Sequence, residues 1–140
     1  MSATLSALTS LRTYRGNLEP TRTYVKRWWH WLPTPGLPCD GVMTLGQVKE
    51  KSYGVDEDVY AVCEVKSVWP AARMFVVRKL GADAGSDQEQ YQTTIHPGGR
   101  TFCTCKAGQC KTEVCRHRCG LAAVMAAGLL PKRELQGDVA

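Results

Sequence analysis

The sequence predicts an α+β fold: a small antiparallel β-sheet, followed by two short strands and a single helix, with an irregular N-terminal arm in front. Three observations support this expectation. Residues 59–65 alternate with a period of two, which is typical of a β-strand, and residues 116–130 carry apolar side chains at the three- and four-residue spacing of a helix. Residues 1–40 hold four of the seven prolines, which oppose regular structure.

Length and composition fit one domain. The chain has 140 residues, of which 44% are hydrophobic and 22% charged, as in an ordinary soluble protein with a modest core. We divide it into a basic, Trp- and Pro-rich arm over residues 1–40, a single α+β domain over 41–131 and a loose tail over 132–140. The most apolar stretch, residues 121–130, is too short to cross a bilayer, so we expect no membrane partner.

The arm contains an unusual aromatic segment. Trp28, Trp29 and Trp31 fall within four residues, next to Lys26 and Arg27. One interpretation is that the tryptophans dock the arm onto the domain, because Trp buries a large area. The other is a basic and aromatic platform that stacks nucleobases.

The domain reads as strands followed by a helix. Strands are expected over residues 59–65 and 74–80, and a hairpin joins residues 91–95 to residues 100–105 through the turn at 96–99. A helix is expected from residue 116 to residue 130, where a proline stops it.

Charge is unevenly distributed along the chain. The formal net charge is +5. Residues 1–31 carry five Lys or Arg and one Glu, residues 98–118 carry the same numbers, and residues 32–97 carry nine acidic and six basic side chains. Two basic regions that flank an acidic one indicate a polyanionic partner.

Cysteine usage favours a metal site. Five of the seven cysteines fall within residues 103–119, with one histidine among them. An odd cysteine count and a poor secretion signal point to a reducing, intracellular compartment (cytoplasmic, or nuclear in a eukaryote), where clustered cysteines bind metal more often than each other. Zn²⁺ binds thiolate and imidazole in a tetrahedron. Cys103 and Cys105 can share it if the strand bends after them, and Cys115 and His117 can reach it from the helix start.

The order Cys103-x-Cys105, nine intervening residues, then Cys115-x-His117 opening an apolar helix resembles the SWIM-type zinc finger. The motif covers about residues 100–130. The resemblance implies a ββα layout in which these four residues bind Zn²⁺. It also implies that Cys119 is a core position, although Cys119 could replace His117 as a ligand, and that Cys110 is a loop thiol or spare ligand.

The sequence predicts a non-catalytic protein without a small-molecule substrate, because four protein ligands close a zinc site and no catalytic motif is found. The SWIM resemblance implies association with nucleic acid, above all DNA, in a DNA-transaction or mobile-element context; the alternative is a protein-interaction adaptor for a larger enzyme. The candidate nucleic-acid contacts are Lys26, Arg27, Trp28, Trp29, Lys106, Lys111, Arg116 and Arg118. The basic residues near the cysteines could instead offset the charge of the metal site.

Overall fold

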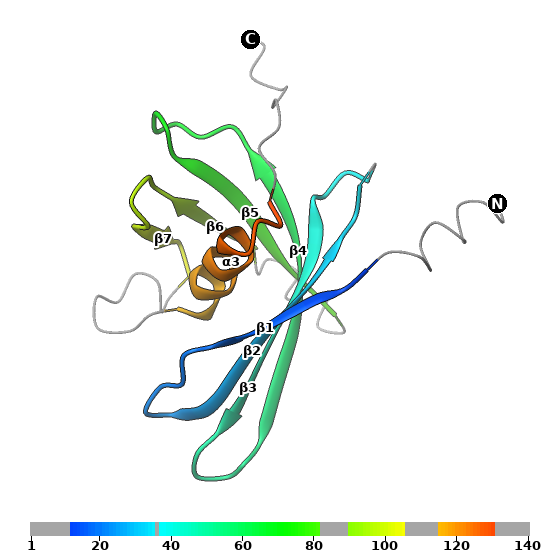
Figure 1. Ribbon diagram of the computed structural model, residues 1–140, viewed down its shortest axis with the longest axis vertical. Helices are drawn as coiled ribbons and strands as arrows, with labels where there is room; N and C mark the ends of the chain where they lie inside the picture. Colours follow the sequence, from blue (N-terminus) through cyan, green and yellow to red (C-terminus); the bar gives the residue numbers. More distant parts are fainter. Residues whose placement is uncertain (1–11, 36, 82–89, 106–114, 131–140) are drawn as a thin grey trace, which may run out of the picture.

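Seven strands and one helix make up the part of the chain that the computed structural model describes, which comprises residues 12–35, 37–81, 90–105 and 115–130. The strands form one antiparallel sheet in sequence order, and the helix follows them (Figure 1). The elements are β1 (Tyr14–Leu18), β2 (Tyr24–Pro33), β3 (Gly41–Lys49), β4 (Val55–Val65), β5 (Arg73–Leu80), β6 (Gln90–Ile95), β7 (Thr101–Cys103) and α3 (Arg116–Ala126).

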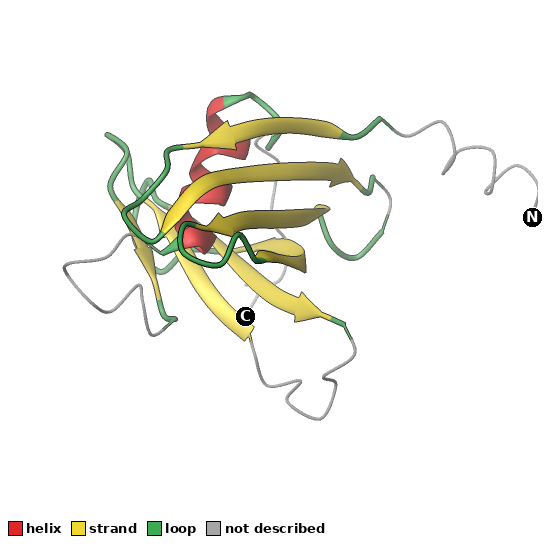
Figure 2. Ribbon diagram, turned by 90° about the horizontal axis from the view of Figure 1, so that it is seen from below, coloured by secondary structure: helices red, strands yellow, loops and turns green. Residues whose placement is uncertain are grey.

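The sheet curls into a half-barrel, and α3 lies against its concave side (Figures 1 and 2). The helix contacts β1, β2 and β3 from one end of the sheet and β6 and β7 from the other. It therefore joins the two ends of the curled sheet. In the described part of the chain, no helix is long and apolar enough to span a membrane.

The expected fold is wrong in two respects. There is no small sheet followed by a separate ββα zinc finger, because β6 and β7 are the last two strands of the continuous seven-stranded sheet. Nor is the N-terminal arm irregular, because β1 and β2 pair with each other and β2 pairs with β3. The prolines lie at strand ends and in connections: Pro33 is the last residue of β2, and Pro20 falls between β1 and β2. In these positions proline costs no ladder hydrogen bond.

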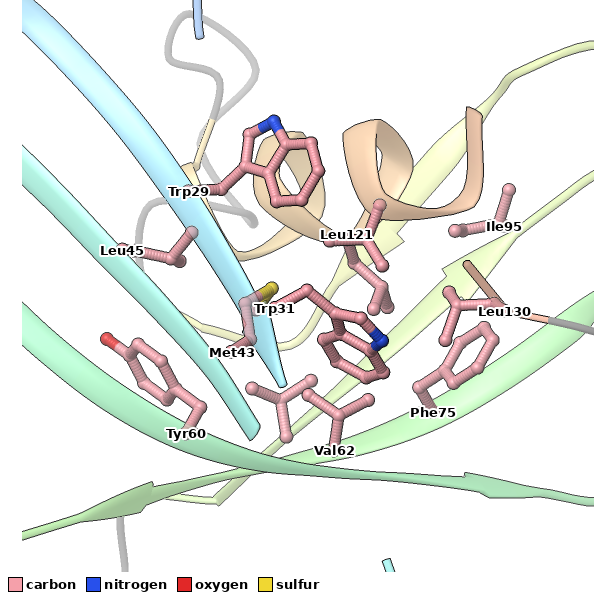
Figure 3. Packing of buried hydrophobic residues seen from close by; sticks show 12 residues of the cluster. Trp29, Trp31, Met43, Leu45, Tyr60, Val62, Phe75, Ile95, Leu121 and Leu130 are labelled. Carbon is pink, nitrogen blue, oxygen red and sulfur yellow. The ribbon is translucent and has the colours of Figure 1, made fainter. Parts of the chain in front are cut away.

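The main core lies between the concave face of the sheet and α3 (Figure 3). Trp29 and Trp31 of β2 are 6% and 1% exposed and belong to this core, together with Leu121 of the helix. The other buried members are Met43, Leu45, Tyr60, Val62, Phe75, Val77, Ile95, Val124 and Leu130. Two of the three neighbouring tryptophans thus dock β2 into the fold, as the first interpretation of this segment predicts.

The period-two pattern of residues 59–65 correctly predicts strand β4. The side chains that enter the core, however, are the even-numbered ones, not the odd-numbered apolar side chains. Tyr60 and Val62 are 1% and 0% exposed and face the helix side, whereas Val59, Ala61 and Cys63 are only partly buried. Both phases of this strand carry apolar side chains, so sequence polarity alone does not distinguish the inner face from the outer face.

A glycine lets the helix approach the sheet closely. A Cβ atom built on Gly120 would lie 2.4 Å from Cδ2 of Leu45 and 3.3 Å from the sulfur of Met43. A larger residue at this position would require Leu45 to move or α3 to shift away from β3. Gly120, which weakens helix propensity, is therefore needed for packing, and the close contact holds the first turn of the helix against the sheet.

Candidate metal centre

Four side chains converge between β7 and the start of α3: Cys103, Cys105, Cys115 and His117. One potential ligand atom from each lies within 4.8 Å of all the others, and all four residues are buried. Ligand atoms in a tetrahedral zinc–thiolate site are about 3.8 Å apart, so a small contraction would satisfy that geometry. The cluster could therefore bind a metal ion.

Regular structure positions three of the four side chains, and Cys105 follows the end of β7 by two residues. Cys103 is the last residue of β7 and lies opposite Thr93 of β6. Cys115 is the N-cap of α3, where its sulfur accepts a hydrogen bond of 3.4 Å from the backbone N–H of Arg118. A helix N-terminus stabilises negative charge, so this position suits a thiolate. The expected chain bend after Cys105 lies outside the described residues.

The thiols of Cys103 and Cys115 shift each other's pKa in opposite directions. A hydrogen bond from Cys115 is the main reason that the pKa of Cys103 is lowered, and hydrogen bonds from His117 and Thr93 act in the same direction. The same hydrogen bond, together with burial, raises the pKa of Cys115. A bound cation would stabilise both groups as thiolates and displace their protons.

His117 is held in one ring orientation by two tyrosines. Its ring stacks on Tyr91 with centroids 4.6 Å apart, and the ring of Tyr60 meets it edge-on at 5.0 Å. Nδ1 lies 3.9 Å from the sulfur of Cys103, and Nε2 lies 3.2 Å from the hydroxyl oxygen of Tyr60. Burial raises the pKa of Tyr60, so its phenol stays protonated and can accept from Nε2–H. This bond would leave Nδ1 as the ligand atom.

The basic residues beside the cluster are engaged within the fold. Arg116 of α3 forms an ion pair with Asp58 of β4, and Lys79 of β5 lies 3.6 Å from the same carboxylate. Arg118 donates to the backbone oxygen of Thr101 at 3.0 Å. These contacts fasten the first turn of α3 to both β4 and β7.

The candidate nucleic-acid residues do not form one surface. Arg27 is 5% exposed and donates to the backbone oxygen of Glu19 at 2.9 Å, and Trp29 lies in the core. Lys26 and Trp28 face the opposite, outer side of β2. Arg116 and Arg118 lie beside the cysteine cluster, and Lys106 and Lys111 fall outside the described residues.

The other cysteines that the structure describes lie outside the cluster. Cys119 is partly exposed on α3 and does not belong to the group of ligand atoms, whereas His117 does. Cys110 falls outside the described residues. Cys63 of β4 donates to the backbone oxygen of Pro38, and Cys39 contacts the hydroxyl of Thr34.

Sequence reasoning missed the residues that surround the ligands. Tyr60, Tyr91 and Thr93 contact His117 or Cys103. Thr93 is the cross-strand neighbour of Cys103 in the β6–β7 hairpin, so the register of that predicted hairpin could have indicated it. Tyr60 comes from β4 and meets His117 because the sheet curls around α3. No spacing within the chain links Tyr60 to the cysteines.

Comparisons with protein-family models, with curated proteins and with solved structures find no match to this chain.

Proposed function

We propose that this chain is a non-catalytic zinc-binding module in which Zn²⁺ is held by Cys103, Cys105, Cys115 and His117 in a SWIM-type arrangement. The observation that carries the proposal is the convergence of these four buried ligand atoms within 4.8 Å. Three thiolates and one imidazole form a ligand set typical of structural zinc, and soft sulfur ligands disfavour calcium and magnesium.

The ion would act as a clamp. It would connect the end of β7, at one edge of the sheet, to the N-terminus of α3, which also contacts the opposite edge. Structural zinc supplies apparent binding free energy on the order of 10 kcal/mol at neutral pH, comparable to the whole stability of a small domain. Four protein ligands complete a tetrahedron and leave no position for a substrate, which supports a non-catalytic role.

Metal analysis of the purified protein tests this proposal. We expect about one zinc per chain in the wild type and loss of zinc in Cys103→Ser and His117→Ala. Cys119→Ser is the matched control, because Cys119 lies on the same helix outside the cluster. Retention of zinc by His117→Ala with loss in Cys119→Ser would contradict the ligand set, and a wild type free of metal would contradict the site.

The partner that we propose is nucleic acid. Three thiolates and one divalent cation change the formal charge from +5 to +4, so a basic excess remains after metal binding. Phosphate contacts by Lys and Arg weaken steeply as salt rises, which makes a salt titration of oligonucleotide binding the decisive measurement. Binding that does not depend on salt, or no binding, would contradict this partner.

One observation favours a protein partner instead. Val68 and Trp69 in the β4–β5 connection are 77% and 57% exposed, and Phe102 on β7 is 60% exposed. Exposed aromatic side chains are enriched in protein interfaces. An adaptor would bind its partner at fixed stoichiometry, and the double variant Trp69→Ala, Phe102→Ala would lose that partner while it retained zinc.

A further inference from the structure

We infer that the outer face of β1 and β2 binds single-stranded nucleic acid, with a base stacked on Trp28 and phosphates held by Arg15 and Lys26. This inference rests on the proposed nucleic-acid partner and adds to it the surface and the form of the nucleic acid. It replaces the eight scattered candidates with one contiguous site.

The site is a groove of about 400 Å³ on the side of the sheet that faces away from α3. Its lining residues are Arg15, Gly16, Asn17, Lys26, Trp28 and His30. They come from the neighbouring strands β1 and β2 (Figure 1), and the antiparallel register places Arg15 opposite His30 and Asn17 opposite Trp28. The intervening residues Trp29 and Trp31 face the core, so this strand presents one tryptophan outward and two inward.

Trp28 is a fixed platform. Its cross-strand neighbour on β3 is Gly46, and a Cβ atom built there would lie 2.1 Å from the indole ring. The indole ring therefore packs against the backbone of Gly46, where any larger residue would clash with it. Its Nε1 atom donates a long hydrogen bond of 3.4 Å to a carboxylate oxygen of Glu57 on β4. The ring lines the groove while it is held against the sheet, so stacking would cost little ordering of the side chain.

The groove is basic and its cations are available. Arg15 and Lys26 are exposed, and neither forms an ion pair with any other residue that the structure describes. Nζ of Lys26 lies over the Trp28 ring, 5.8 Å from its centroid, in a cation–π contact that an incoming base would replace. None of the six lining residues is acidic. A positively charged groove with an aromatic ring beside it has the chemistry of a single-strand site.

The aromatic ring selects the form of the nucleic acid. A base can stack on Trp28 only when it is not stacked within a duplex, whereas a duplex offers this face mainly its phosphates. Stacking tolerates any base, because every base has a π-face. We therefore expect weak sequence preference and tighter binding to single strands than to duplexes.

The test is fluorescence anisotropy of the zinc-loaded protein with a short labelled oligothymidylate and with a duplex, over a range of salt concentrations. Trp28→Leu keeps an apolar cover over Gly46 but removes the π-face, and should weaken single-strand binding about 5- to 100-fold. Trp28→Phe should restore part of it. Trp69→Leu is the matched control, because Trp69 is exposed elsewhere on the molecule.

The two cations are tested separately from the ring. If the Trp28 variant fails to fold, this second experiment still tests the inference. Replacing Arg15 and Lys26 by Gln should reduce the slope of log affinity against log salt by about 1.4, or about 0.7 for each lost phosphate contact. Arg78→Gln is the control, since Arg78 is exposed on β5, away from the groove.

Three outcomes would count against the inference. If Trp28→Leu and the Arg15, Lys26 double variant both bind like the wild type, the groove is not the site, although the nucleic-acid partner stands. Binding of the duplex alone would overturn the single-strand form while it leaves the proposed function intact. If neither form binds in a salt-sensitive way, the proposed partner itself is overturned, and this inference with it.

Discussion

Basic side chains serve opposite purposes at two places in this molecule. Beside the metal centre, Arg116 pairs with Asp58 and Arg118 donates to a backbone oxygen of β7. On the outer face of β1 and β2, Arg15 and Lys26 are exposed, and neither forms an ion pair among the described residues. The first pair holds the fold together, whereas the second pair is available to a partner.

The difference follows from where the metal centre lies. A cluster of buried cysteines lies at the start of α3, so the guanidinium groups that flank it are partly buried and need partners of their own. Exposed lysine and arginine side chains carry no such requirement, because water solvates them. A high density of positive charge in a sequence therefore does not by itself mark a nucleic-acid surface.

Removal of the proposed zinc ion should give the largest loss of structure. The loss should be concentrated around the cysteine cluster and not on the outer face of β1 and β2. In excess EDTA we expect the helical circular dichroism to fall and amide exchange to rise in β6, β7 and α3, because binding energy on the order of 10 kcal/mol is lost. Exchange in β2 and β3 should rise less, since their core contacts include many partners other than α3.

The control for this experiment is EDTA presaturated with zinc, which should change nothing. Unaltered circular dichroism and unaltered proteolysis in excess EDTA would show that the cysteine cluster closes without metal. Uniform loss of protection along the whole sheet would show instead that the half-barrel is a single cooperative unit with the metal centre.

Removal of the internal ion pair should have an intermediate effect. Arg116→Ala should destabilise the fold by about 1–3 kcal/mol in urea unfolding, because it leaves the partly buried Asp58 with only Lys79. Lys49→Ala is the control: its pair with Asp56 is about half exposed on both sides and should contribute less than about 1 kcal/mol. If both variants lose the same free energy of unfolding, the Arg116 ion pair contributes no more to stability than an exposed one.

The convergence of four potential ligand side chains could be predicted because it is local. Cys103, Cys105, Cys115 and His117 fall within fifteen residues, and their spacing on a strand end and a helix start already brings the side chains together. The contact of Tyr60 with them could not be predicted in this way. Tyr60 is 57 positions from His117, and only the curvature of the sheet brings its hydroxyl to Nε2.

The fold was predicted in part for a similar reason. Local alternation identified β4, and the turn at residues 96–99 identified the β6–β7 hairpin. Strands β1, β2 and β3 were not predicted. Proline density obscured β1 and β2 despite β-forming residues such as Tyr24, Val25 and the tryptophans, and β3 contains two glycines, which weaken a strand pattern. The burial of Arg27 depends on a carbonyl oxygen eight residues away, which no polarity pattern reveals.

The smallest effect is expected where the second pair of basic residues is removed. The Arg15→Gln, Lys26→Gln double variant should change the free energy of unfolding by less than about 0.5 kcal/mol, because exposed side chains without ion pairs contribute little to stability. Urea unfolding of the zinc-loaded variant beside Arg116→Ala gives the comparison directly. A loss of unfolding free energy as large as that of Arg116→Ala would mean that Arg15 and Lys26 support the fold. The contrast between these two residues and the basic residues beside the cysteine cluster would then be wrong. A stability that is unchanged, together with weakened nucleic-acid binding, would assign these two cations to a partner.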